Sequence, residues 1–199
     1  MSCNNGVVLA KVTPRRRRTA EESREIILDV AARRLRQHGL DGLNITGVAE
    51  QAGISHATLL HHFGSSGGMR EALAEKMTAQ LISDLVEALN ANVPLHELVA
   101  NVFDALAAGG HAKLIAWRTL EGGDDAQTID VLGDLFERLL DSSRQALQTD
   151  DQQELRQIIY LVTVAAIGHG LAGDVLSRLL KMSDEEVEQF PQWMRQRLT

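Results

Sequence analysis

The chain has 199 residues and a formal net charge of −7; 44% of its residues are hydrophobic and only 4% are aromatic. This length allows one domain or two small ones, each with a hydrophobic core. Three prolines among long runs of helical periodicity predict an all-α protein. Cys3 is the single cysteine, which excludes an internal disulfide and makes a reducing cytoplasm the expected location.

The charge is unevenly distributed along the chain. Residues 1–63 carry a net charge of +3 and the remainder carries −10. A net negative charge alone argues against binding to nucleic acid. A basic head on an acidic body, however, suits DNA contact at one end and solubility at the other.

Residues 1–18 are expected to form a flexible basic arm, because Arg15, Arg16, Arg17 and Arg18 are consecutive like charges that resist folding alone. A solvated tail is the usual explanation of such a run. In DNA-binding folds, basic arms of this kind reach phosphates or the minor groove. No apolar segment follows the run, so a signal peptide is not expected.

The first helix is predicted to begin at Thr19 or Ser23, and Thr19 with Glu22 fits a capping box. Gly39 is expected to end this helix. Its apolar stripe repeats at spacings of three and four residues: Ile27, Val30, Ala31 and Leu35.

Two short helices joined by a tight turn are predicted between Asn44 and Phe63. Asn44 and Ser55 suit the two N-caps, and Gly53 suits the left-handed position that ends the first helix. Leu59 and Phe63 are four residues apart, so both are expected to point into the domain. The opposite face of the second helix is then free, as in a helix-turn-helix whose second helix enters the major groove.

The free face offers few strong base contacts, because it has no Arg or Asn for bidentate pairing with G or A. We therefore expect modest discrimination per half-site, with a dimer that reads an inverted repeat. Two packed helices without any DNA function are the alternative. Besides the arm arginines, the residues expected to contact DNA are Thr46, Ser55, His56, Ala57, Thr58, Leu60 and His61.

Residues 19–66 are thus assigned to a DNA-binding domain, and residues 67–199 to a helical bundle. The family resemblance described below implies that this bundle serves effector binding and dimerisation. The predicted helices of the second part are 69–90, 94–108, 111–120, 126–147, 152–180 and 184–198, the last interrupted at Pro191.

The segment 152–180 is the most apolar helix. Its uncharged part falls short of the roughly 20 residues of a membrane span. Gly168–Gly173 matches G-x-G-x-x-G, but too few residues follow for a nucleotide-binding fold. A helix this apolar must be covered on nearly all sides, and its small residues let another helix approach closely. The family resemblance described below implies that this cover is its copy in a second subunit. The predicted interface residues are Ala165, Gly168, Ala172, Phe190 and Trp193.

An effector pocket is the least constrained expectation. Few polar groups are available for it, which favours a small apolar ligand. Simple core packing is the alternative for each candidate. The candidates are Met77, Leu81, Phe103, Leu106, His111, Leu114, Trp117 and Phe136.

Residues 20–75 resemble the N-terminal domain of the TetR (tetracycline-repressor-like) family of transcriptional regulators. The resemblance runs from Ile27 through Ala49-Glu-Gln-Ala-Gly-Ile-Ser and Thr58-Leu-Leu-His-His-Phe-Gly-Ser to Glu71-Ala-Leu. It implies a homodimer whose all-helical C-terminal domain holds an effector pocket and the dimer interface. Two positions depart from the family pattern: Leu60 replaces a usual Tyr that lies against DNA, and Ser66 replaces a usual Lys on a phosphate.

The sequence therefore favours a homodimeric regulator of transcription, a repressor that a ligand releases from double-stranded DNA. The alternative is a helical small-molecule-binding protein whose DNA binding is weakened or lost. No catalytic motif is found, so an enzyme is not expected. A metal site is not expected either, because His61-His62 has no nearby Cys or acid at metal-ligand spacing. No cofactor and no membrane association are expected.

Overall fold

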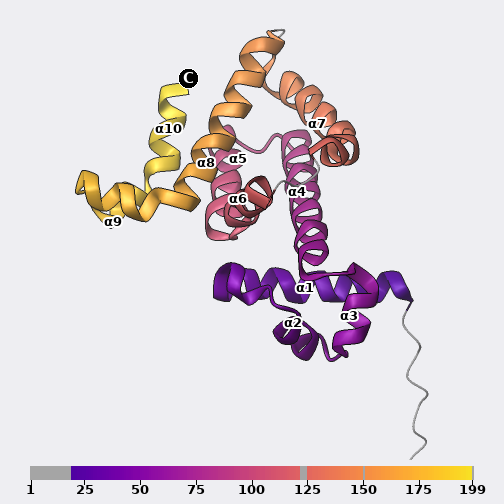
Figure 1. Cartoon of the computed structure of the whole chain (residues 1–199). Helices are drawn as coiled ribbons and strands as arrows, with labels where there is room; N and C mark the ends of the chain where they lie inside the picture. The colour runs from indigo at the N-terminus through magenta and orange to yellow at the C-terminus, as the bar shows by residue number, and fades with distance from the viewer. Residues whose placement is uncertain (1–18, 122–124, 150, 199) are drawn as a thin grey trace, which may run out of the picture.

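The computed structural model describes residues 19–121, 125–149 and 151–198, which form helices joined by short turns, without a strand. The all-α prediction is confirmed, while Arg15–Arg18 lie outside the described residues. The helices are α1 Ala20–His38, α2 Ile45–Ala52, α3 His56–Phe63, α4 Ser66–Asn90, α5 Leu95–Phe103, α6 His111–Glu121, α7 Asp125–Leu147, α8 Gln152–Leu180, α9 Asp184–Glu188 and α10 Phe190–Leu198, with short turns η1 Gly39–Gly42 and η2 Asp104–Ala108 (Figure 1).

The N-terminal helices begin and end where local chemistry predicts. Thr19 and Glu22 form both hydrogen bonds of a capping box at the start of α1. The Gly47 amide donates to the Asn44 side chain at 2.8 Å. Gly53, with a φ of 68°, ends α2 in the left-handed region.

Three helix boundaries differ from the prediction. Helix α4 begins at Ser66 and runs through two glycines, because the Ser65 hydroxyl accepts the Gly68 amide at 2.9 Å and caps the first turn. Helix α5 ends at Phe103 and continues as the wider π-helical turn η2. The C-terminal break falls before Phe190, and Pro191 lies in the first turn of α10, where a missing N–H costs little.

Helix α4 connects the two parts of the molecule. In Figure 1 it rises from the layer of α1, α2 and α3 and runs beside α7 in the upper part. Its first turns belong to the core of the lower layer, where Met69 and Leu73 are buried together with residues of α1, α2, α3 and α6. Lys76 of α4 forms ion pairs with Glu25 and Asp29 of α1. The two layers are therefore joined through one continuous helix.

Helix α8 contacts α5, η2, α6 and α7. It is continuous through the G-x-G-x-x-G segment, which is therefore not a strand-to-helix loop. By length and composition alone α8 could cross a membrane, but only 17% of its most apolar 18-residue window is buried. Within one chain, α8 therefore leaves most of this apolar window uncovered.

Gly170 lies where α8 closely approaches η2 and α6. A Cβ built at this position would lie 2.8 Å from the Ala107 Cα in η2 and 3.1 Å from the Ala112 Cβ in α6. Neither is the movable end of a long side chain, so only glycine permits this approach.

We expect Gly170→Ala to lower the free energy of unfolding by about 1–3 kcal/mol, because the added methyl group overpacks a backbone contact. Gly133→Ala is the matched control, since nothing lies within 4 Å of a Cβ at that position in α7. The control is expected to raise stability by about 0.5–1 kcal/mol through helix propensity. Urea unfolding followed by circular dichroism measures both, and equal effects of the two substitutions would contradict the proposed close contact.

Candidate functional site

The inner face of α3 is fixed in the core of the N-terminal layer. The Leu59 side chain is 0% exposed and that of Phe63 is 9% exposed. Arg24 of α1 holds the end of the helix, because its Nη1 donates to the His62 carbonyl at 3.0 Å and its guanidinium lies 4.5 Å from the centre of the Phe63 ring. The rotation of α3 about its own axis is thus set from two sides.

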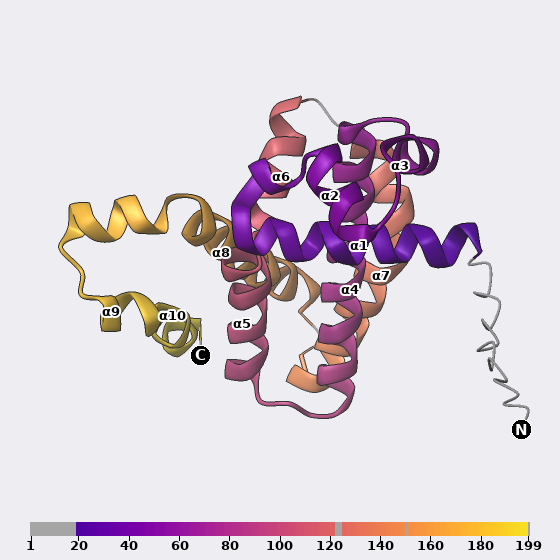
Figure 2. The same cartoon turned by 90° about the horizontal axis from the view of Figure 1, so that it is seen from below.

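The outer face of α3 is free. In the view of Figure 2, α3 lies at the edge of the N-terminal layer, beside the end where α1 begins. Ser55 and Thr58 are exposed but are hydrogen-bonded to each other, with 2.9 Å between their hydroxyl oxygens. The exposed residues of α3 are His56, Ala57, Thr58, Leu60 and His61, all of them predicted DNA contacts.

Of the positions on either side of α3, some have exposed side chains and others have side chains that hydrogen-bond within the N-terminal layer. Thr46 is exposed in the first turn of α2, on the N-terminal layer. The Ser66 hydroxyl donates to the Leu43 carbonyl at 3.2 Å, so it joins α4 to the segment before α2. The sequence did not indicate a structural role for Arg34, whose Nε donates to the Gly42 carbonyl at 2.8 Å. Arg24 was missed in the same way, since nothing in the sequence distinguishes a positioning arginine from a solvated one.

A cavity of about 340 Å³ lies in the upper helices. Four predicted pocket residues line it, namely Leu81, Leu106, His111 and Phe136. Its other lining residues, which the sequence did not indicate, are Thr78, Ile82, Leu85, Leu89, Leu98, Val99, Val102, Ile115, Leu139, Ser143, Leu155, Ile158, Ile159, Val162 and Thr163.

The other four predicted pocket residues do not line this cavity. Leu114 is buried in the core of the N-terminal layer, and Met77 and Trp117 pack against that core. Phe103 is buried against α8 and α10, with its ring centre 5.8 Å from that of Phe190. All four side chains pack in a core, and Met77 also lines a second cavity on the other side of His111.

His111 is the most buried polar residue of the cavity, with 1% of the residue exposed. Burial lowers its pKa to about 4, opposed only in part by a hydrogen bond to the Ala74 backbone. Its Nε2 lies 2.9 Å from the Thr78 hydroxyl of α4. The imidazole is therefore neutral at pH 7 and fixed to a second helix.

Helix α6 touches both parts of the molecule. His111 and Ile115 line the cavity, while Leu114 and Trp117 pack in the core that also holds Leu59 of α3. Arg70 of α4 lies with its guanidinium 5.2 Å from the Trp117 ring centre. A displacement of α6 at the cavity would therefore change the packing of the core beneath α3.

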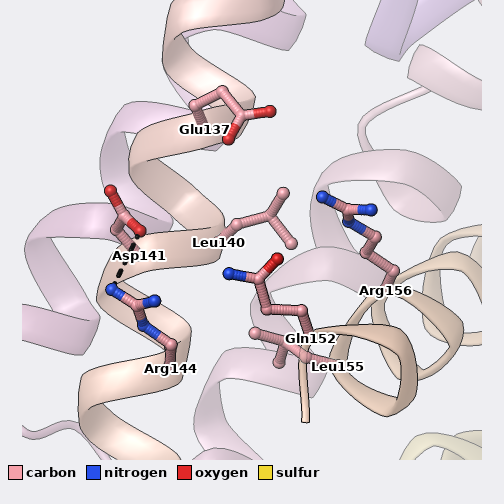
Figure 3. A pocket seen from close by; sticks show the side chains of 7 residues that line it. All are labelled: Glu137, Leu140, Asp141, Arg144, Gln152, Leu155 and Arg156. Carbon is pink, nitrogen blue, oxygen red and sulfur yellow. Dashed lines mark ion pairs between the residues drawn. The ribbon is translucent and has the colours of Figure 1, made fainter. Parts of the chain in front are cut away.

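A second, polar crevice of about 30 Å³ lies between the end of α7 and the start of α8 (Figure 3). Arg144 and Asp141 form an ion pair at its rim, with 3.4 Å between nitrogen and oxygen. Leu155 also lines the large cavity. This volume holds about one water molecule, so the crevice is no ligand site.

The outward face of α8 carries a row of exposed residues. The row repeats at alternating steps of three and four, a spacing typical of helices that pack side by side. Of the predicted interface residues, Gly168 and Trp193 are exposed, Ala165 and Ala172 are half-buried, and Phe190 packs inward. The row consists of Leu161, Val164, Gly168, Leu171 and Val175.

Comparison with known proteins identifies the N-terminal layer. Residues 27–73, from α1 to the start of α4, match the family model described as bacterial regulatory proteins, tetR family. The N-terminal layer of this chain is a tetR-family domain. This family consists of transcriptional regulators rather than enzymes, and the helix-turn-helix of α2 and α3 is its DNA-binding element.

Two further similarities agree with this assignment. A curated relative, the HTH-type transcriptional regulatory protein RaaS of Mycobacterium tuberculosis (strain ATCC 25618 / H37Rv), is 27% identical over 106 residues; the match spans 47% of this chain and half the length of that protein. A crystal structure from Rhodococcus sp. RHA1, described as that of a transcriptional regulator, has the same fold. It superposes with a TM-score of 0.56 at 16% identity over 81% of this chain and 97% of the other.

The buried His111 predicts a pH-dependent stability. Because its pKa falls to about 4 on folding, the unfolded chain binds the proton first as the pH decreases. This contribution is complete above about pH 6.5 and is lost progressively toward pH 4. Urea unfolding at pH 7 and pH 5 should show a loss of about 2 kcal/mol that is absent in His111→Gln.

His38→Gln is the control for this prediction, because His38 is exposed at the end of α1. That variant should keep the pH dependence of the unmodified chain. An unchanged pH dependence in His111→Gln would show that this imidazole does not titrate differently in the two states.

Proposed function

We propose that the protein is a ligand-released repressor that binds an inverted-repeat operator in double-stranded DNA as a homodimer. The observation that carries this proposal is the division of α3 into a buried face with Leu59 and Phe63 and an exposed face with Ala57 and His61. A bacterial transcriptional regulator works where the DNA is, so the cytoplasm is the proposed location.

The exposed face of α3 would read the major groove. His61 can hydrogen-bond a base edge, and the Ala57 methyl group can meet a thymine methyl group. The N-terminus of α3 brings His56 and Ser55 to the position where recognition helices touch bases and phosphates. The proposed contacts are directional but few, which supports recognition of two half-sites together.

The row on α8 supports the homodimer. It joins Leu161, Val164, Leu171 and Val175 into an uncovered apolar face, and a Cβ added to Gly168 at its centre would meet nothing within 4 Å. Such a face is costly to leave in water and suits the same face of a second copy related by a two-fold axis.

The cavity and α6 support release by a ligand. A ligand beside His111 and Ile115 would favour the position of α6 that accommodates it best, and Leu114 would carry that shift into the core beneath α3. Two recognition helices must lie about 34–36 Å apart to occupy successive major grooves. A small change in each subunit would therefore lower the affinity for the operator.

The alternative function is ligand binding without DNA binding. It is favoured by the exposed Leu60, which cannot donate a hydrogen bond, and by Ser66, whose hydroxyl is bonded to Leu43. Selection of bound sequences from a random DNA pool separates the two functions, because only the repressor enriches an inverted repeat.

Replacing His61 should weaken binding to the selected operator. We expect His61→Ala to lower affinity about tenfold, the loss of one hydrogen bond to a base, with little effect on random DNA. His38→Ala is the matched control, since His38 is exposed and is the last residue of α1, outside the helix-turn-helix. Fluorescence anisotropy measures both, and equal losses for the operator and random DNA would assign His61 to the backbone instead.

A charge within the α8 row should prevent pairing of subunits. We expect Leu171→Glu to raise the dimer dissociation constant at least about 100-fold, because a carboxylate would be buried at the centre of the interface. Leu120→Glu is the control, since Leu120 on α6 is 87% exposed and lies outside the row. Light scattering coupled to size exclusion gives the masses, and a Leu171→Glu dimer of unchanged affinity would exclude this face.

A further inference from the structure

The large cavity is unusually uniform in its chemistry. Among the lining residues that the structure describes, none is Lys, Arg, Asp or Glu, and only four carry a polar side-chain atom. An ionised group moved from water into such a site loses its hydration without gaining a partner. The four polar residues are Thr78, His111, Ser143 and Thr163.

The polar side chains of the cavity are not equivalent. The Thr163 hydroxyl donates to the Ile159 carbonyl of its own helix at 2.8 Å, so it serves α8 itself. Ser143 lies on α7, one turn after Leu139. Thr78 and His111 instead bond to each other across two helices, at 2.9 Å.

The pair of Thr78 and His111 offers a ligand a hydrogen-bond acceptor. Because the neutral imidazole also donates to the Ala74 backbone carbonyl, its Nε2 accepts from the Thr78 hydroxyl, and the Thr78 oxygen keeps a lone pair for a further donor. A ligand hydroxyl can donate to this oxygen, whereas a carbonyl or an ether oxygen cannot.

From this geometry we infer that the cavity binds an uncharged, mainly hydrocarbon ligand with one hydroxyl group, an alcohol or a phenol, and that Thr78 and His111 bind this hydroxyl. The inference rests on the proposed role of the cavity as the effector site and specifies its ligand. Since Thr78 lies on α4 and His111 on α6, the hydroxyl would act on the two helices that enter the N-terminal core.

A second cavity of about 370 Å³ offers cations to an anionic ligand, which is the alternative to the uncharged ligand proposed here. It shares Leu81, Leu85 and His111 with the first cavity and is also lined by Arg36 and Lys76. An anionic ligand that reached across His111 would find cations there. Lys76, however, is already hydrogen-bonded to Glu25 and Asp29 of α1.

Three probes with one hydrocarbon skeleton distinguish these cases: 4-tert-butylphenol, tert-butylbenzene and 4-tert-butylbenzoate. Calorimetric titration of the full chain without DNA should give binding of the phenol, about tenfold weaker binding of tert-butylbenzene, and binding of the benzoate at least about 100-fold weaker. Benzoate binding as tight as that of the phenol, or no phenol binding up to its solubility limit, would overturn the inference.

Matched variants locate the hydroxyl. Thr78→Val should lower the affinity for the phenol about tenfold, to that of tert-butylbenzene, and leave tert-butylbenzene unaffected. Thr119→Val removes the same group from α6 outside the cavity, where the Thr119 hydroxyl donates to the Ile115 carbonyl at 3.1 Å, and should change neither affinity. If both variants bind the phenol like the unmodified chain, the assignment to Thr78 is wrong.

A gel shift with the selected operator tests the function separately. Release of the operator by the phenol and not by the benzoate supports both proposals. Binding of the phenol in calorimetry without any binding of DNA would support the ligand assignment and exclude the repressor function.

Discussion

The burial of Leu59 and Phe63 beneath α1 is the constraint on which the rest of the structure depends. These two side chains occupy one face of α3, and full burial of each contributes about 2–3 kcal/mol. Because a helix is rigid, fixing one face fixes the other, so His61 has to face solvent. Arg24 adds a directional restraint at the end of the helix through the His62 carbonyl. Any function of α3 is therefore a function of its exposed face.

The same core joins the recognition helix to the upper bundle. Met69 and Leu73 from α4 and Leu114 from α6 are buried in it, so the N-terminal layer is not a separate unit attached by a linker. Close-packed interiors change by discrete repacking rather than by gradual deformation. A ligand that shifts α6 would therefore have to repack residues around Leu114, which gives the cavity a physical route to the DNA face.

Sequence reasoning succeeded where local rules decide the outcome. The caps at Thr19, Asn44 and Ser55 and the inward spacing of Leu59 and Phe63 depend on neighbours within a few residues, and the structure has them as predicted. The π-helical end of α5 and the early start of α4 were missed. They depend on which hydrogen bonds the backbone forms in that turn rather than on residue preference.

The cavity could be predicted only in part, because two faces of one short helix meet two different cores. His111 and Leu114 are three residues apart on α6, and periodicity assigns both to an apolar face. Which core each joins depends on the direction of α4 and on the close crossing of α8 at Gly170, and neither is encoded in local spacing. The polar partner Thr78 was missed for the same reason, since its contact with His111 spans 33 positions of sequence.

Two arginines form hydrogen bonds within the N-terminal layer, which reduces the positive charge available for contacts with DNA. Arg24 and Arg34 each donate to a backbone carbonyl within the N-terminal layer, so these two cations serve the fold first. Ser66, bonded to Leu43, adds no cation either. Under the proposed function, attraction to phosphates then falls to the exposed Arg33 and Arg36, to the amide ends of the helices, and to Arg15–Arg18. The basic arm, rather than the helix-turn-helix, would supply most of the salt-dependent affinity, while α3 would supply the discrimination between sequences.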